Sequence, residues 1–158
     1  MTRLTVDIIK PTGNEANGDI GRFGTGFMAN TTIDYLHSLI LGMRPELLSK
    51  VGSIYKIDEY IKTNTGYIHE LCKPEDNESI LMLVGVQSHQ FQHALDLACK
   101  IKYHNPRKQI IIGGPHAMTV DTSPLHNGPV SFAMSQAEVV LEEIIEDAIG
   151  GELKPVYG

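Results

Sequence analysis

The apolar residues of the chain fall into short runs that alternate with longer segments of helical period. Three runs, at residues 4–9, 80–86 and 109–112, are almost wholly apolar or β-branched. Such runs are typical of strands inside a parallel sheet whose two faces are both covered. A strand-like segment at 53–57 and a short run at 130–133 bring the predicted number of strands to five.

Amphipathic helices are predicted between the strands. In the first, Ile33, Leu36 and Ile40 share one face, and Thr31 can cap the start while Gly42 can stop the end. The helix therefore extends from about residue 32 to residue 41.

Two more helices follow later strands. Apolar residues recur at helical spacing over 91–101, before Asn105 and Pro106 end that helix. The last helix has the S-x-x-E spacing of a capping box at 135–138, and 150–151 are the glycines that stop it.

This alternation predicts an α/β fold. Strands separated by helices form right-handed βαβ units and a mainly parallel sheet. Five strands in 158 residues fit one domain, 1–158, with a three-layer Rossmann-like (flavodoxin-like) sandwich. In such sheets a ligand lies outside the carboxyl ends of the strands. The loops to inspect are therefore 11–30, 87–91, 113–120 and 133–138.

Residues 43–79 are harder to interpret. Pro45 can open a short helix that continues through Leu48, and residues 67–71 fit either a helix or a strand. Residues 11–30, by contrast, are clearly a loop. They include five glycines, and their apolar residues follow neither the helical nor the strand period. Loops this long in compact domains are usually functional.

Composition and charge exclude several classes of protein. A hydrophobic content of 42% excludes a disordered chain. The chain has 13 Lys and Arg against 19 Asp and Glu, a net charge of −6, so nucleic acid is not expected as a partner. Neither a signal peptide nor a membrane span fits the first residues, and we expect a cytoplasmic protein. Cys72 and Cys99 are too few for a disulfide framework or an iron–sulfur cluster. Demanding chemistry must come from a bound molecule or a partner.

The loop after the central strand carries an amide, a hydroxyl and an imidazole in Gln87, Ser88 and His89. Ser88 can bind a ligand or simply cap the helix. His89 and His93 are four residues apart and so share a helix face, but no third metal ligand accompanies them, which favours an exposed pair that arose by chance.

Gly113 and Gly114 directly follow a strand. A tight left-handed turn needs only one glycine, so the pair favours the close approach of a ligand.

The sequence excludes two kinds of site that occur in folds of this class. A receiver domain needs an aspartate where Gln87 stands, and the glycines of 21–26 lack the spacing of a dinucleotide-binding motif.

The order of three segments resembles a known family. The segments are GVQS at 85–88, IIGGPHA at 111–117 and SQAE at 135–138. Together they resemble the cobalamin-binding domain that precedes the catalytic barrel in cobalamin-dependent radical S-adenosylmethionine enzymes. The likeness is close over 80–158 and loose before it, and IIGGPHA is its most specific part. It implies a Rossmann-like sandwich with the corrin ring of cobalamin across the strand ends.

The resemblance also implies roles for individual residues. Ser88, Gly113 and Gly114 would line the pocket for the nucleotide tail, with His116 nearby. The loop 135–138 stands where the family has G-E-x-E and keeps only the last acid. The expected cofactor-binding residues are Thr12, Gly13, Gln87, Ser88, His89, Gly113, Gly114, Pro115, His116, Ser135, Gln136 and Glu138.

Two departures from related enzymes change what we expect. Residues 11–30 hold no histidine, so the lower face of cobalt should lack a histidine ligand from the protein; His37 lies in the first helix and should be partly packed there. The C-x-x-x-C-x-x-C motif of the radical catalytic domain is also absent. We therefore expect 152–158 to be a linker to a radical S-adenosylmethionine domain, in a longer chain or a separate subunit, and the chain alone not to be catalytic.

Two other functions remain open. A flavodoxin-like flavin or nucleotide-binding protein would use 12–14 to cradle a phosphate. A relic domain would keep the fold, bind no cofactor and mediate protein contacts.

Overall fold

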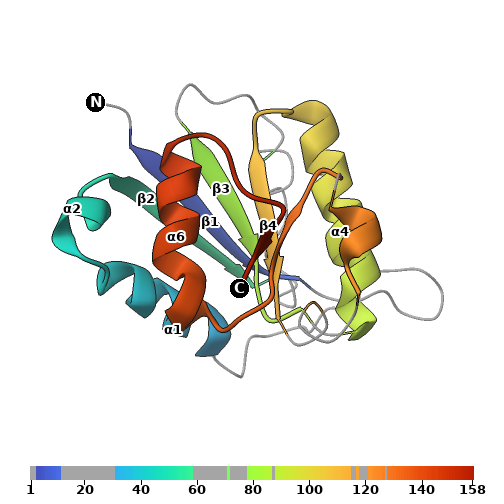
Figure 1. The fold of residues 1–158 in the computed structure, drawn as a ribbon, viewed down its shortest axis with the longest axis horizontal. Coiled ribbons are helices and arrows are strands. Elements are labelled where there is room, and N and C mark those ends of the chain that lie inside the picture. Colours follow the sequence, from blue (N-terminus) through green and yellow to red (C-terminus); the bar gives the residue numbers. More distant parts are fainter. Residues whose placement is uncertain are drawn as a thin grey trace.

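The computed structural model describes residues 3–11, 31–58, 71, 78–86, 88–114, 117, 121–126 and 128–158. These residues form one parallel sheet with helices packed on it, which confirms the α/β, Rossmann-like class (Figure 1). The strand order is β2-β1-β3-β4-β5-β6, the flavodoxin-like order with one strand added.

The elements alternate along the chain as the hydrophobic pattern predicts. The strands are β1 (Leu4–Lys10), β2 (Val51–Asp58), β3 (Ser79–Leu83), β4 (Gln109–Gly113), β5 (Ser131–Ala133) and β6 (Val156–Tyr157). The helices are α1 (Thr31–Leu41), α2 (Pro45–Leu48), α4 (Ser88–His104) and α6 (Ala137–Ile149), with a short 3₁₀ turn η1 (Ser123–Leu125). Among the described helices, none is long and apolar enough to cross a membrane.

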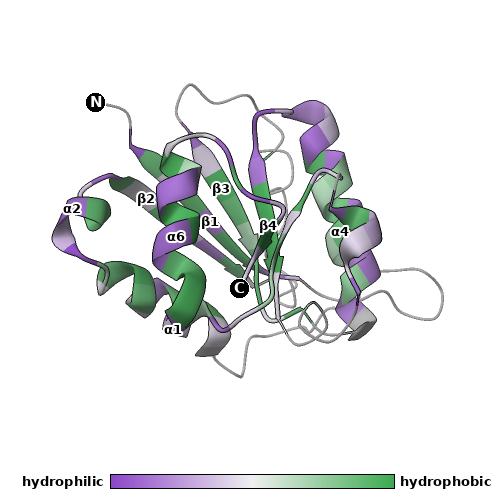
Figure 2. Cartoon of the chain, in the orientation of Figure 1, coloured by the Kyte–Doolittle hydropathy of each residue, from purple (hydrophilic) through white to green (hydrophobic). Residues whose placement is uncertain are grey.

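The sheet separates two hydrophobic clusters. Alternate residues of β1 point to opposite faces, so Val6 and Ile8 pack with α1, α2 and α6, whereas Ile9 packs with α4. Figure 2 shows the central strands as mostly hydrophobic and the helices as mixed, as expected when only one side of each helix faces the sheet. The predicted face of the first helix is confirmed, since Leu36 and Ile40 are buried.

The structure describes part of the region 43–79. The short helix from Pro45 is confirmed as α2, and the strand at 53–57 is present in the longer β2. Of residues 67–71, only Leu71 lies in the described part of the chain, where it is helical. The loop 11–30 lies outside the described residues except for Pro11.

The prediction of five strands is wrong, because Val156 and Tyr157 form a sixth. Residues Phe132 and Ala133 of β5 pair in parallel with them. Part of the expected linker 152–158, at Val156–Tyr157, is therefore an edge strand of the sheet. Two residues are too few to show the alternation by which strands are recognised in a sequence.

The side chain of Tyr157 anchors this last strand. It is 1% exposed, donates a hydrogen bond to Asp147 Oδ2 at 2.6 Å and accepts one from the backbone N–H of Lys154 at 2.9 Å. Burial and the bond to Asp147 raise the pKa of Tyr157, so the hydroxyl stays protonated over the physiological range.

We expect Tyr157→Phe to lower the free energy of unfolding by about 1–3 kcal/mol, because two part-buried hydrogen bonds of the hydroxyl are lost. Urea denaturation measures this change. Tyr103→Phe is the matched control, since Tyr103 is 82% exposed, and it should leave stability unchanged. Equal stability of the two variants would show that the bonds of Tyr157 do not hold the strand.

Candidate functional site

The carboxyl edge of the sheet has a switch point between β1 and β3. Helix α1 follows β1 onto one face and α4 follows β3 onto the other, so the chain leaves these two adjacent strands in opposite directions. Ligands of open α/β sheets bind at such a point.

A polar network occupies the switch point. The ammonium group of Lys10 donates to the carbonyl oxygen of Gly85 and, at 3.4 Å, to Gln90 Oε1. Gln90 is 2% exposed and donates from Nε2 to the carbonyl oxygen of Pro11 at 2.9 Å. The network ties the end of β1 to the segment after β3.

Strand β3 ends earlier than the apolar run 80–86 predicts. It stops at Leu83 because Gly85 adopts a left-handed conformation, with φ of 61°. The chain stays in the core beyond that point: Val86 is fully buried and its N–H donates to the carbonyl oxygen of Gly113 at 3.0 Å.

Beside the switch point lies a pocket of about 470 Å³ between α1, α6 and the sheet. Met82 and Ile111 form its floor, and Leu36 of α1 and Leu141 of α6 form its walls. Its lining is mostly apolar and its volume is within the usual range for small-molecule sites. A flat apolar group can therefore enter between the helices and the sheet.

The two glycines after β4 have different roles. Among the described residues, a Cβ on Gly113 would contact only Ala133 Cβ, at 3.5 Å, so these residues leave open space above Gly113. A Cβ on Gly114 would lie 2.2 Å from the backbone nitrogen of Val86, and its φ is 138°. Gly114 is thus required by the close approach of two chain segments, whereas Gly113 leaves room on the pocket side of the sheet.

The start of α6 forms the mouth of this pocket. The capping box expected at 135–138 is wrong: α6 begins after Gln136, which makes no side-chain capping bond. Glu138 instead accepts a hydrogen bond from the hydroxyl of Tyr35. That bond joins α6 to α1, and both residues line the pocket.

The bond between Tyr35 and Glu138 should be visible in a titration. By stabilising the carboxylate, it holds the pKa of Glu138 below its ordinary value. We expect Tyr35→Phe to raise this pKa toward that of a free glutamate, measured by NMR of the side-chain carboxyl. The bond stabilises the fold above the ordinary pKa of glutamate and is lost as the pH falls through the lowered value.

Tyr55→Phe is the control for this titration, because Tyr55 is also about half exposed but lies on β2. It should leave the titration of Glu138 unchanged. An unaltered pKa in Tyr35→Phe would show that the two helices are not joined in this way in solution.

The pocket brings together part of the expected cofactor-binding set. Gly113, Gly114, Ser135, Gln136 and Glu138 all line it. The others fall on parts of the chain that the structure leaves out: Thr12, Gly13, Gln87, Pro115 and His116 lie outside the described residues, as do the side chains of Ser88 and His89 at the start of α4.

The histidines that the structure describes form no cluster of potential metal ligands. His93 is 8% exposed, so the expectation of an exposed pair with His89 is wrong for His93. His37 is half-buried, as expected. Within the residues that the structure describes, no three potential metal ligands come together.

Sequence reasoning missed the residues that α1 and β1 bring to the site. Tyr35 and Lys10 carry no motif, and each meets its partner only through folding. A charged residue at the end of a mostly apolar strand, as Lys10 is, was the one available signal.

The chain was also compared with protein-family models, with curated proteins and with solved structures, and none of these matches it. The geometry and chemistry of the carboxyl edge are therefore the observations that bear on function.

Proposed function

We propose that the chain is a cobalamin-binding module and that the pocket between α1, α6 and the sheet receives the nucleotide tail of the cofactor. The observation that carries this proposal is the open space above Gly113, inside an apolar pocket at the edge where α/β sheets bind ligands. The family resemblance implies that the same glycine lines the pocket for the tail.

The residues of the pocket fit that group. The tail ends in a flat, apolar benzimidazole, which suits a slot floored by Met82 and Ile111. Its ribose and phosphate are polar, and the hydroxyl of Ser135 and the amide of Gln136 lie on the same pocket lining. An apolar slot with a few polar groups is typical of small-molecule sites.

The chain's own contribution would be binding and orientation. Bound cobalamin supplies methyl-transfer or radical chemistry at cobalt, which is a property of the cofactor. The partly buried network of Lys10, Gly85 and Gln90 joins two segments of the edge over which the ring would lie. The reacting partner would be a radical S-adenosylmethionine domain, in the same chain or in another subunit.

Retention of ligand after desalting tests the proposal. Purified protein is mixed separately with hydroxocobalamin, with cobinamide, which lacks the nucleotide tail, and with flavin mononucleotide. We expect near-stoichiometric absorbance from hydroxocobalamin alone. Retention of flavin only would favour the flavodoxin-like function, and retention of none would favour a relic domain. Equal retention of cobinamide would contradict the assignment of the tail to this pocket.

A further inference from the structure

The pocket between α1, α6 and the sheet, called the α1–α6 pocket from here on, has a polar mouth and an apolar interior. Both helices start at the carboxyl edge of the sheet and run back toward the amino edge, because each connects two parallel strands. Among the described residues that line the pocket, the polar side chains all lie at the starts of these helices; they are Thr32, Tyr35, Ser135, Gln136 and Glu138.

The interior of the α1–α6 pocket is lined by buried apolar side chains. Met82 and Ile111 are paired residues of β3 and β4 on its floor, and each is 4% exposed. Both have strands on either side, so their backbone groups are taken up by the sheet. Leu141 and Ile144 line the pocket further along α6, and Ile144 lies about 9 Å along the helix axis from Glu138.

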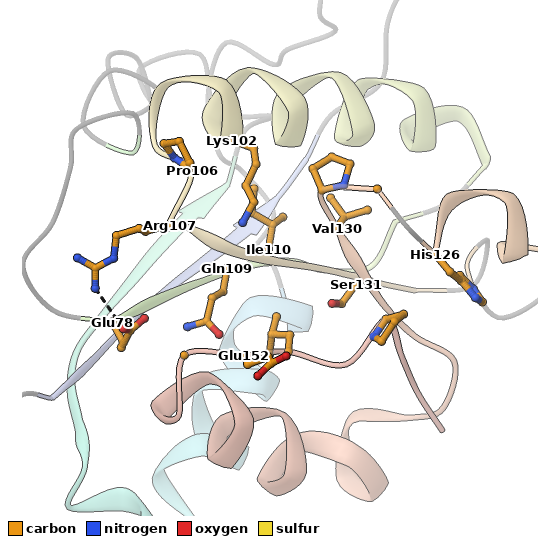
Figure 3. Close-up of a pocket in the computed structure, with 15 residues that line it drawn as sticks. Glu78, Lys102, Pro106, Arg107, Gln109, Ile110, His126, Val130, Ser131 and Glu152 are labelled. Carbon is orange, nitrogen blue, oxygen red and sulfur yellow. Dashed lines mark hydrogen bonds and ion pairs between the residues drawn. The ribbon is translucent and has the colours of Figure 1, made fainter.

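A second pocket, of about 360 Å³ at the amino edge of the sheet, has charged and polar side chains in its wall (Figure 3). Arg107 and Glu78 form an ion pair there at 3.2 Å. The amide of Gln109 donates to the carbonyl oxygens of Ser79 and Ala148, and its Oε1 has no partner among the described residues. Polar side chains thus lie within the wall of this second pocket, whereas the described residues of the α1–α6 pocket carry them only at its mouth.

An apolar interior distinguishes the bases of nucleotides by their hydrogen-bonding groups. Dimethylbenzimidazole, the base of cobalamin, presents two methyl groups on the ring edge that points away from the ribose. Adenine presents ring nitrogens and an amino group instead. Water satisfies these polar atoms, and burying them without partners costs free energy. The methyl groups gain from leaving water, and the adaptable thioether of Met82 suits contact with an aromatic ring.

We propose that the α1–α6 pocket selects among cobamides, the cofactors that share the corrin ring of cobalamin and differ in the base of the tail. It accepts benzimidazole and phenol-derived bases and discriminates against purines. Met82, Ile111 and Ile144 are the specificity-determining residues, because they line the part of the pocket where a purine would need hydrogen-bond partners. This inference rests on the proposed cobalamin-binding function and adds to it the class of base.

Absorbance titrations of the full chain compare cobalamin with two cobamides that differ from it only in the base, which is adenine in one and p-cresol in the other. We expect the p-cresol cobamide to bind at least as tightly as cobalamin and the adenine cobamide to bind about ten-fold or more weakly. Release of the base from cobalt cannot produce this order. Adenine is the weaker base and the weaker cobalt ligand, so its release costs less.

Substitutions at Met82 test the residue that is assigned to the floor. Met82→Gln keeps the length of the side chain and adds an amide, so the affinity ratio between cobalamin and the adenine cobamide should fall to about three-fold or less. Met82→Leu is the matched control, which keeps the floor apolar and should preserve the ratio. Glu152→Gln, in the wall of the second pocket, should leave both affinities unchanged. Circular dichroism verifies folding, and the wild-type ratio is decisive even if Met82→Gln does not fold.

The other outcomes separate two failures. Equal affinity of the wild-type chain for the three cobamides would overturn the selection by base and leave the cobalamin-binding function in place. Retention of none of them would overturn both. An unchanged ratio in folded Met82→Gln would contradict the role of Met82, and loss of the adenine cobamide in Glu152→Gln would place the base in the second pocket.

Discussion

Gly113→Leu is expected to abolish cobalamin binding while the fold remains intact. Gly113 lies on the same face of β4 as Ile111, toward α1 and α6, and its added side chain would extend into the open pocket. Within the described part of the chain, the new Cβ would meet Ala133 alone, at an ordinary contact distance of 3.5 Å. The leucine would occupy the volume proposed for the nucleotide tail, and affinity should fall by about 100-fold or more, measured by absorbance titration with hydroxocobalamin.

Two glycine variants provide the controls. Gly113→Ala adds one methyl group and should weaken binding far less than leucine. Gly114→Ala should instead reduce stability, because alanine disfavours the φ of 138° and its Cβ would clash with the backbone of Val86. If Gly113→Leu binds cobalamin as tightly as the wild type, the tail does not enter this pocket.

Removing either partner of the buried ion pair between Lys108 and Asp7 is expected to lower the free energy of unfolding by about 3–5 kcal/mol. Lys108 Nζ lies 2.7 Å from Asp7 Oδ2, and the side chains are 0% and 8% exposed. The pair joins β1 to the residue before β4, across β3. Asp7→Asn and Lys108→Met each leave one charge in the core, and urea denaturation measures the cost.

The double variant Asp7→Leu, Lys108→Met separates two explanations. If the loss in the single variants comes from an uncompensated buried charge, replacing both partners by apolar residues should restore most of the stability. If the double variant loses as much stability as the two single variants together, Asp7 and Lys108 contribute independently, and their mutual neutralisation does not stabilise the fold. Single variants that cost less than about 1 kcal/mol would show that water reaches the pair.

The fold class and most elements could be predicted from the sequence because they depend on local patterns. The strand 109–112 and the helices around Ile33 and Leu141 appear where the apolar period places them. The stop at Gly150–Gly151 is also confirmed, with Gly151 at a φ of 81°. Predictions that depended on a longer-range partner failed: Glu138 binds Tyr35 instead of capping its own helix, and Val156–Tyr157 pairs with β5.

The candidate site also combines a feature that the sequence predicts with one that only the structure shows. The glycine pair marked the end of β4 as special, because two residues without side chains are unusual after a strand. Only the structure distinguishes Gly114, which contacts the backbone of Val86, from Gly113, which faces the pocket. The difference depends on the neighbouring strand, and no local pattern records it.

The sequence by itself determined that this chain is an α/β domain with its candidate chemistry on the loops at one edge of the sheet, since the period of apolar residues and the turn residues act over a few positions. Only the tertiary structure decided the sixth strand, the pocket between α1 and α6, the buried pair of Asp7 and Lys108, and the unpaired oxygen of Gln109. The physical reason is that pockets, buried charges and hydrogen-bond partners arise between residues tens of positions apart, which meet only when the strands take their order in the sheet.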